Sequence, residues 1–176
     1  MKLSFLAVAA IALSVVACKP SAKSEPSQTT TTNGTVSSRD GLVALEAKMV
    51  KGKAVGSNAS ERKIAQAMTD IFADDDGSKD WAAIVRVDEA ATPKKVVLLV
   101  RMDDLRDLRK GDRKEMLELL ATEVDEAIGP GADLAIGIKG KVFFGAVGTR
   151  NGGGTLKKST GSVVDSKPLE AAIAAL

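Results

Sequence analysis

Carboxylates are the side chains through which this chain could do chemistry, because it has no histidine, no tyrosine and a single cysteine. Ser-His-Asp and Cys-His nucleophilic catalysis both need an imidazole, and so do histidine-based zinc sites. Paired aspartates or glutamates can still hydrolyse glycosides, and clusters of carboxylate oxygens can bind calcium or magnesium. Carboxylate chemistry therefore survives the exclusions that the composition makes.

Three aspartates, Asp103, Asp104 and Asp107, directly follow a stretch with the pattern of a strand, which is a common place for catalytic groups. Two of them facing each other across a cleft would suit a carboxylate-dependent hydrolase. Five basic residues are interleaved with these acids, and opposite charges at one-turn spacing usually form exposed ion pairs. We therefore expect no catalytic residue here, and the hydrolase is the least favoured of our hypotheses.

The same basic residues form a candidate patch for anionic lipid head groups or for a cell-wall polymer. Each cation that lies close to such a surface contributes about 1 kcal/mol to binding. The patch consists of Arg106, Arg109, Lys110, Arg113 and Lys114. A charged face that only keeps the domain soluble is the simpler interpretation of these residues.

Three other features suggest ligand sites but lack the spacing that such sites need. The acidic run Asp74–Asp80 does not have the alternating ligands and the final glutamate of an EF-hand calcium loop, so we expect a solvated loop. The glycine-rich stretch Gly148–Thr155 does not match the spacing of a phosphate-binding loop. Trp81 begins an expected strand, where tryptophan more often fills the edge of a core than stacks on a ligand. The sequence thus predicts no metal site and no cofactor.

The N-terminus has the layout of an export signal. A positive charge at Lys2 precedes the apolar run Leu3–Val16, which ends in the small residue Ala17. This run is too short to remain in a bilayer as a membrane-spanning helix. We expect residues 1–17 to be removed and the rest of the chain to act outside the cytoplasm.

The residues around the expected cleavage site, Val15-Val16-Ala17-Cys18, resemble the lipobox of bacterial lipoproteins. The resemblance implies a diacylglycerol thioether on Cys18, cleavage before it and, usually, acylation of the new amine. Two or three acyl chains hold a protein firmly, at roughly 0.8 kcal/mol for each buried methylene. Lys19 is not the aspartate that commonly retains lipoproteins in the inner membrane, which favours the outer membrane, facing the periplasm. The alternative is an ordinary export signal with a chance cysteine.

A low-complexity segment separates Cys18 from the expected domain. Residues 19–39 are rich in Ser, Thr, Pro and Lys, and such a segment cannot bury enough apolar surface to offset its ordering entropy. We expect residues 18–39 to form a flexible tether, on the order of 25 Å long as a random coil, followed by one domain at residues 40–176. The near balance of 25 basic and 23 acidic residues gives no reason to expect a nucleic-acid partner.

Apolar periodicity predicts four helices and four strands in this domain. Val96–Val100 is continuously apolar, which is typical of a central strand covered on both faces. Lys139-Gly140 predicts a two-residue hairpin turn that places Ile136 opposite Phe143, with Phe144 on the other face of the sheet. The expected helices span about residues 40–51, 60–73, 112–128 and 166–176, and the expected strands are Trp81–Val87, Lys95–Met102, Asp133–Ile138 and Lys141–Val147.

This order of elements, ααββαββα, predicts an α+β fold with a single four-stranded, mainly antiparallel sheet and helices packed on one face. Ser57 or Ser60 is expected to cap the second helix. The alternation of helices and strands resembles the BON domain of exported bacterial proteins, which implies phospholipid or envelope binding, although the strand before Lys95 departs from the order in that domain.

The expected location in the cell envelope and the missing catalytic residue types together predict a non-enzymatic envelope lipoprotein. Its lipid anchor would hold it at the membrane, and its tethered domain would bind a protein partner through a face or an edge of the sheet. Anionic lipid and cell-wall polymer are further partner hypotheses. An inhibitor or immunity lipoprotein that neutralises an exported toxin or hydrolase is the alternative function.

Overall fold

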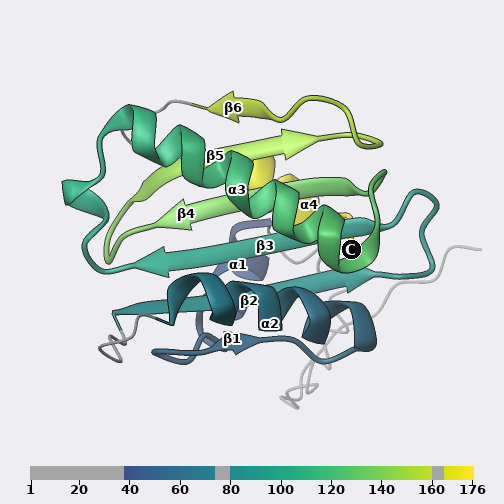
Figure 1. Ribbon diagram of the computed structural model, residues 1–176, viewed down its shortest axis with the longest axis horizontal. Helices are drawn as coiled ribbons and strands as arrows, with labels where there is room; N and C mark the ends of the chain where they lie inside the picture. The colour runs from purple at the N-terminus through teal and green to yellow at the C-terminus, as the bar shows by residue number, and fades with distance from the viewer. Residues whose placement is uncertain (1–37, 74–79, 160–164) are drawn as a thin grey trace, which may run out of the picture. The chain divides into compact units, whose positions relative to one another are not determined.

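The computed structural model describes residues 38–73, 80–159 and 165–176 (Figure 1). The expected signal (residues 1–17), Cys18 and most of the expected tether lie outside this part of the chain. The helices are α1 (Ser38–Glu46), α2 (Ala59–Phe72), the short 3-10 helix η1 (Leu105–Asp107), α3 (Lys110–Ile128) and α4 (Lys167–Ala174). The strands are β1 (Ala54–Val55), β2 (Trp81–Asp88), β3 (Lys95–Met102), β4 (Asp133–Lys139), β5 (Phe144–Arg150) and β6 (Lys157–Ser159).

The strands form one mixed sheet in which they lie side by side in chain order, as Figure 1 shows. β1 pairs with β2, and β3 pairs with β4, in parallel; the other neighbours are antiparallel. Each parallel pair is joined by a crossover helix, α2 for the first and α3 for the second, because a helix that packs along the sheet returns the chain to the same end. The fold is therefore α+β as expected, with three antiparallel and two parallel pairings, but within the described residues the sheet has six strands, not four.

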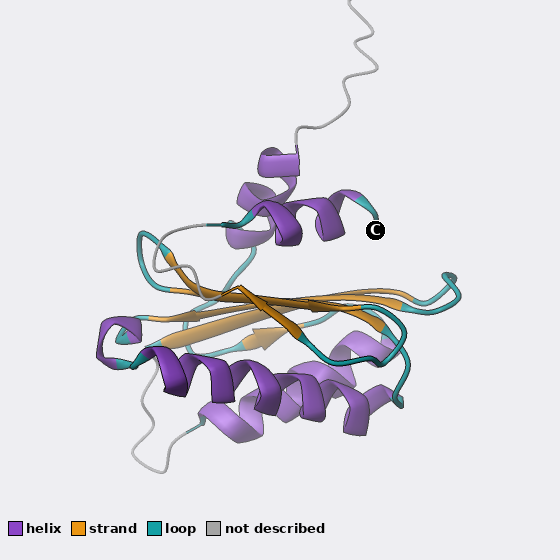
Figure 2. Ribbon diagram, turned by 90° about the horizontal axis from the view of Figure 1, so that it is seen from above, coloured by secondary structure: helices purple, strands orange, loops and turns teal. Residues whose placement is uncertain are grey.

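The helices cover both faces of the sheet, so the prediction of a single covered face is wrong (Figure 2). α2 and α3 lie on one face and α1 and α4 on the other. β3 shows the reason: Val96, Leu98 and Val100 are buried in the core beneath α2 and α3, whereas Val97 and Leu99 are buried in the core beneath α1 and α4. The continuously apolar run thus belongs to a central strand covered on both faces, and this prediction is confirmed.

The turn between β4 and β5 differs from the two-residue hairpin expected at Lys139-Gly140. β4 ends at Lys139 and β5 begins at Phe144, and the N–H of Gly140 donates to the carbonyl of Phe143 at 2.7 Å within the connection. An irregularity after Ile138 shifts the register. Ile136 therefore pairs with Gly148, not with Phe143.

The two phenylalanines of this hairpin do face opposite sides of the sheet, as expected. Phe143 packs against the core beneath α2 and α3, and Phe144 is buried in the core beneath α1 and α4.

None of the helices in the described residues combines the length and the apolar character that crossing a membrane requires.

Candidate functional site

The basic residues of the predicted patch do not converge on one point. Arg109, Lys110 and Lys114 are exposed at the start of α3. Arg113 turns back instead, and its Nη1 donates to the carbonyl of Leu108 at 2.7 Å. Arg106 belongs to η1, and its side chain lies outside the described part of the structure. The patch thus lies at an exposed helix start, and one of its cations, Arg113, is hydrogen-bonded to the backbone.

The three aspartates after β3 differ in their exposure to solvent. Asp104 and Asp107 are exposed, whereas the carboxylate of Asp103 is only 12 % exposed and is surrounded by cations. Asp103 follows the last residue of β3 and is held there by a hydrogen bond of 2.8 Å from its N–H to the carbonyl of Asp80. Two carboxylates of this segment therefore do not share a cleft.

Three cations from different elements face the carboxylate of Asp103. Arg101 Nε lies 3.8 Å from Oδ1, Lys51 Nζ lies 3.8 Å from Oδ2, and Lys141 Nζ lies 3.9 Å from Oδ2. Lys141 belongs to the β4–β5 connection, so the ends of β3 and β4 meet here. We call Asp103, Arg101, Lys51 and Lys141 the Asp103 cluster. A hollow of about 210 Å³ opens beside it, lined by Asp103, Leu105, Gly140, Lys141, Val142 and Phe143.

Asp80 shares Lys51 with the Asp103 cluster, at 2.7 Å from Lys51 Nζ to Asp80 Oδ1. This contact holds the pKa of the Asp80 carboxyl below, and the pKa of Lys51 above, its ordinary value, chiefly through the hydrogen bond between the two side chains. A glycosidase needs a general acid whose pKa is raised, so that it carries a proton at neutral pH. Asp80 does not suit that role, and an ion-pair network accounts better for the two acids.

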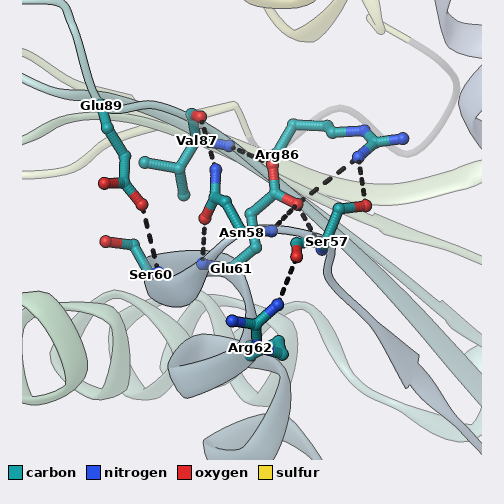
Figure 3. A network of polar contacts seen from close by, with 8 residues as sticks. All are labelled: Ser57, Asn58, Ser60, Glu61, Arg62, Arg86, Val87 and Glu89. Carbon is teal, nitrogen blue, oxygen red and sulfur yellow. Dashed lines mark hydrogen bonds and ion pairs between the residues drawn. The ribbon is translucent and has the colours of Figure 1, made fainter.

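The carboxylate of Glu61, which the sequence did not single out, accepts several backbone hydrogen bonds (Figure 3). Glu61 Oε1 accepts from the N–H of Val87 at 3.0 Å, and Oε2 accepts from the N–H of Ser57 at 2.5 Å. Asn58, not Ser57 or Ser60, caps α2: its Oδ1 accepts from Glu61 N at 2.7 Å, and Glu61 returns the bond in a capping box. The side chain of Glu61 is 5 % exposed, and both of its oxygens accept backbone hydrogen bonds, so we assign this network a structural role.

A second hollow, of about 300 Å³, lies between α4 and the sheet, and we call it the α4 hollow. A row of small side chains forms its floor, with Val97, Ala135 and Thr149 paired across β3, β4 and β5. Ala172 and Ala175 line it from α4. The next row of the sheet contains Gly137, and there Leu169 of α4 packs directly against the sheet. A Cβ on Gly137 would come within 2.6 Å of the Leu169 side chain. The hollow therefore exists because small residues face one another where α4 ends.

Polar groups surround the mouth of the α4 hollow. Lys95 Nζ donates to the carbonyl of Ala175 at 2.8 Å, and Asp133 Oδ1 accepts from the N–H of Gly152 at 2.8 Å. Asn151 also lies in the lining. An apolar floor with a few polar groups at the rim is the usual composition of a binding pocket.

The structure also shows where the remaining candidates from the sequence lie. Trp81 is 5 % exposed in the core, with its ring centroid 5.4 Å from that of Phe72, so it fills the core as expected. The stretch Gly148–Thr155 runs from β5 toward β6, and within the described residues no helix begins there. The acidic run lies outside the described residues except for Asp80. Among the described residues, no group of three acidic or cysteine side chains could hold a metal ion.

The Asp103 cluster could have been found from the sequence only with the strand order in hand. Arg101 lies in the expected strand Lys95–Met102 and Lys141 begins the expected strand Lys141–Val147, and these strands belong to different expected hairpins, which gave no reason to place the two residues together. In the structure β3 and β4 are parallel neighbours, and the residues that follow parallel strands meet at one edge of the sheet.

No protein-family model matches the chain, and no curated protein or solved structure matches it either. The two hollows and the Asp103 cluster are therefore interpreted from their own geometry.

Proposed function

We propose that the chain is a non-enzymatic envelope lipoprotein, anchored through acyl groups on Cys18, whose tethered domain binds a protein partner in the α4 hollow. The export signal and the lipobox resemblance support the location in the cell envelope. The α4 hollow is the observation that carries the binding function, since it combines an apolar floor with a polar rim on a face of the sheet.

The size of the α4 hollow indicates what it accepts. Its volume of about 300 Å³ is at the lower end of the range for small-molecule pockets. That volume suits one or two side chains of a partner better than a large cofactor. The rim supplies donors and acceptors for the backbone of a bound segment, from Lys95, Asp133 and Asn151.

The electrostatic environment supports binding over catalysis. The partly buried Asp103 faces cations, Asp80 is bound to Lys51, and Glu61 accepts backbone hydrogen bonds inside the fold. These carboxylates serve as ion-pair partners or as structural acceptors of backbone hydrogen bonds.

Photo-crosslinking in intact cells tests the partner function. A photoreactive residue at position 172, in the lining of the α4 hollow, is expected to give a discrete crosslinked product. The matched control is position 119 on α3, where Leu119 is 42 % exposed on the other side of the sheet. Thr149→Phe, which fills the hollow from its floor, should abolish the product at 172. Equal products from 172 and 119, or none from 172, would count against the proposal.

A further inference from the structure

We propose that the domain docks on an anionic phospholipid bilayer through a groove beside α1. The inference goes beyond the protein partner, because it concerns a separate surface, and only its argument from the tether rests on the proposed anchor at Cys18. The groove has a volume of about 440 Å³ and lies between α1, the start of α4 and the β4–β5 connection. We call it the α1 groove, and its lining includes Arg39, Val43, Glu46, Lys139, Val142 and Lys167.

The two most exposed large apolar side chains of the described residues lie in the α1 groove. Val142 is 75 % exposed and Val43 is 56 % exposed, and the fold brings them to one surface from the β4–β5 connection and from α1. Single exposed apolar residues are common, whereas several that share a surface with a polar rim mark a site of interaction. The α1 groove is therefore a surface suited to contact with another molecule.

The α1 groove also carries an excess of positive charge. Three cations and two acids line it. Glu46 is paired with Lys139, at 2.6 Å from Oε1 to Nζ, and Glu170 accepts a hydrogen bond from the N-cap serine of α4 at 2.6 Å. Arg39 and Lys167 are exposed, and within the described residues no carboxylate lies at ion-pair distance from either. The molecule that covers the groove should therefore offer negative charge next to apolar surface.

An anionic bilayer offers both at the depths that the α1 groove requires. Its phosphate groups attract exposed lysine and arginine side chains, and the boundary of its acyl chains accepts apolar side chains beneath them. Arg39 and Lys167 match the first property, and Val43 and Val142 match the second.

The place where the chain enters the domain favours a bilayer as the partner. α1 begins at Ser38, directly before Arg39, so the segment that leads back to Cys18 joins the domain at the α1 groove. A tether on the order of 25 Å long would keep this part of the domain near the lipid. Such proximity raises the effective concentration of the surface, so that weak contacts suffice for docking.

Docking through the α1 groove leaves the α4 hollow free for its partner. β4 begins at Asp133, which lines the α4 hollow, and ends at Lys139, which lines the α1 groove. Six steps of about 3.3 Å along a strand separate these two residues by roughly 20 Å. The docked domain would thus present the α4 hollow at the end of the sheet away from the bilayer.

Tryptophan fluorescence on vesicles tests the docking. Cys18 is the single cysteine of the chain, so a maleimide lipid couples the unacylated mature chain to vesicles at this residue, whether or not the cell acylates it. Val142→Trp places a probe in the α1 groove, and phospholipids with brominated acyl chains quench a tryptophan that touches them. The native Trp81 is 5 % exposed in the core and gives a constant background. Leu119→Trp is the matched control, at an exposed apolar position of α3 on the other face of the sheet.

Vesicles of brominated phosphatidylglycerol and phosphatidylcholine are expected to quench the probe at position 142 and not the probe at position 119. Vesicles of brominated phosphatidylcholine alone should quench position 142 much less, because they carry no net negative charge.

Charge variants test which cations hold the domain on the vesicles. Arg39→Gln combined with Lys167→Gln should lower the ratio of docked to undocked domains at least about tenfold, since each cation near an anionic surface contributes about fivefold. Lys110→Gln combined with Lys114→Gln removes the same charge from exposed positions of the predicted patch on α3. This control should leave the quenching at position 142 unchanged.

Four results would overturn the proposal: equal quenching at positions 142 and 119, equal quenching by phosphatidylcholine alone, quenching that persists without Arg39 and Lys167, or quenching that is lost without Lys110 and Lys114. A blue shift of the position-142 probe that grows with protein concentration without vesicles would identify a second copy of the chain in the groove, and would also overturn it. Each leaves the partner function untouched, because crosslinking from position 172 does not depend on the α1 groove.

Discussion

The carboxylate of Glu61, in the first turn of α2, accepts a hydrogen bond from the backbone N–H of Val87 in β2 at 3.0 Å. The carbonyl of the same valine accepts from the side chain of Asn58 at 3.1 Å. β1 covers only Ala83 and Ile84 on this edge of β2. Two side chains of the helix start thus take the place of a longer edge strand, and they protect backbone groups that could otherwise pair with another chain.

Removing the Glu61 carboxylate should therefore destabilise the whole domain. Glu61→Ala leaves the buried N–H of Val87 and the part-buried N–H of Ser57 without their acceptor, and we expect a loss of about 2 to 4 kcal/mol in total. Urea denaturation of the mature protein measures the loss. Glu126→Gln, at an exposed position of α3, is the control and should change stability by less than about 0.5 kcal/mol. A similar small effect at Glu61 would show that the edge of β2 does not depend on this residue.

Gly56 is expected to tolerate no side chain, because it lies directly against the start of α2. A Cβ at this position would come within 2.5 Å of the backbone carbon and oxygen of Glu61. Gly56→Ala should lower stability by about 1 to 3 kcal/mol, in the range of overpacking. Gly111→Ala is the matched control, because a Cβ there meets nothing within 4 Å. Thermal unfolding of the two variants checks the prediction, and equal melting temperatures would refute it.

Asp125 of α3 and Arg150 of β5 form a bidentate ion pair that ties the helix to the sheet. Arg150 Nη1 donates to Asp125 Oδ2 at 2.8 Å, Nη2 donates to Oδ1, and the arginine side chain is 7 % exposed. Asp125→Asn should cost about 2 to 4 kcal/mol, since it leaves a buried charge without its counter-ion. The double variant Asp125→Leu with Arg150→Met should recover most of this loss. If Asp125→Asn has no effect in denaturant titrations, the pair does not hold α3 in place.

Glu89 contributes a pH dependence of known sign. Its Oε1 accepts from the N–H of Ser60 at 3.2 Å, and this backbone hydrogen bond holds the pKa of the Glu89 carboxyl below its ordinary value. A lowered pKa in the folded state stabilises the protein above the ordinary carboxyl pKa, about 4.3, and this stabilisation is lost as the pH falls through the folded value.

The experiment compares Glu89→Gln with the parent protein in urea at neutral pH and at low pH. The variant should be less stable at neutral pH, and the difference should shrink as the solution is acidified. Glu115→Gln, at an exposed position of α3, should show no such trend. A difference between Glu89→Gln and the parent that does not change with pH would rule out the Ser60 hydrogen bond as its cause.

Much of the secondary structure could be predicted because its signals are local. The apolar periodicity of α2 and α3, and the β-branched run of β3, appear in the sequence at the period of each element. The pairing of β3 with β4 could not be predicted in this way. It depends on α3 crossing one face of the sheet, which is a long-range property of the fold.

The short elements were missed for a different physical reason. β1 has two residues and β6 has three, too few for any alternation to show. The expected one-sided cover conflicted with the continuous run Val96–Val100, which had already indicated burial on both faces. α1 ends at Glu46, five residues before the expected end, so Met49 lies beyond the helix.

The candidate sites depended still more on tertiary structure. Asp103 was identified from its place after a strand, but its cations come from the ends of β3 and β4 and from Lys51, far apart in the chain. The role of Glu61 depends on Val87, which lies 26 residues away. Neither relationship has a spacing that a single sequence displays.

The lipid on Cys18 is the claim on which the proposed function depends most. Intact-mass spectrometry of the protein extracted from membranes, followed by mapping of the N-terminal peptide, tests it directly. We expect a chain that begins at Cys18 and carries a diacylglycerol thioether, with a further acyl group on its amine. A chain that begins at Met1 in the soluble fraction, or a mature protein with a free thiol at Cys18, would contradict the account.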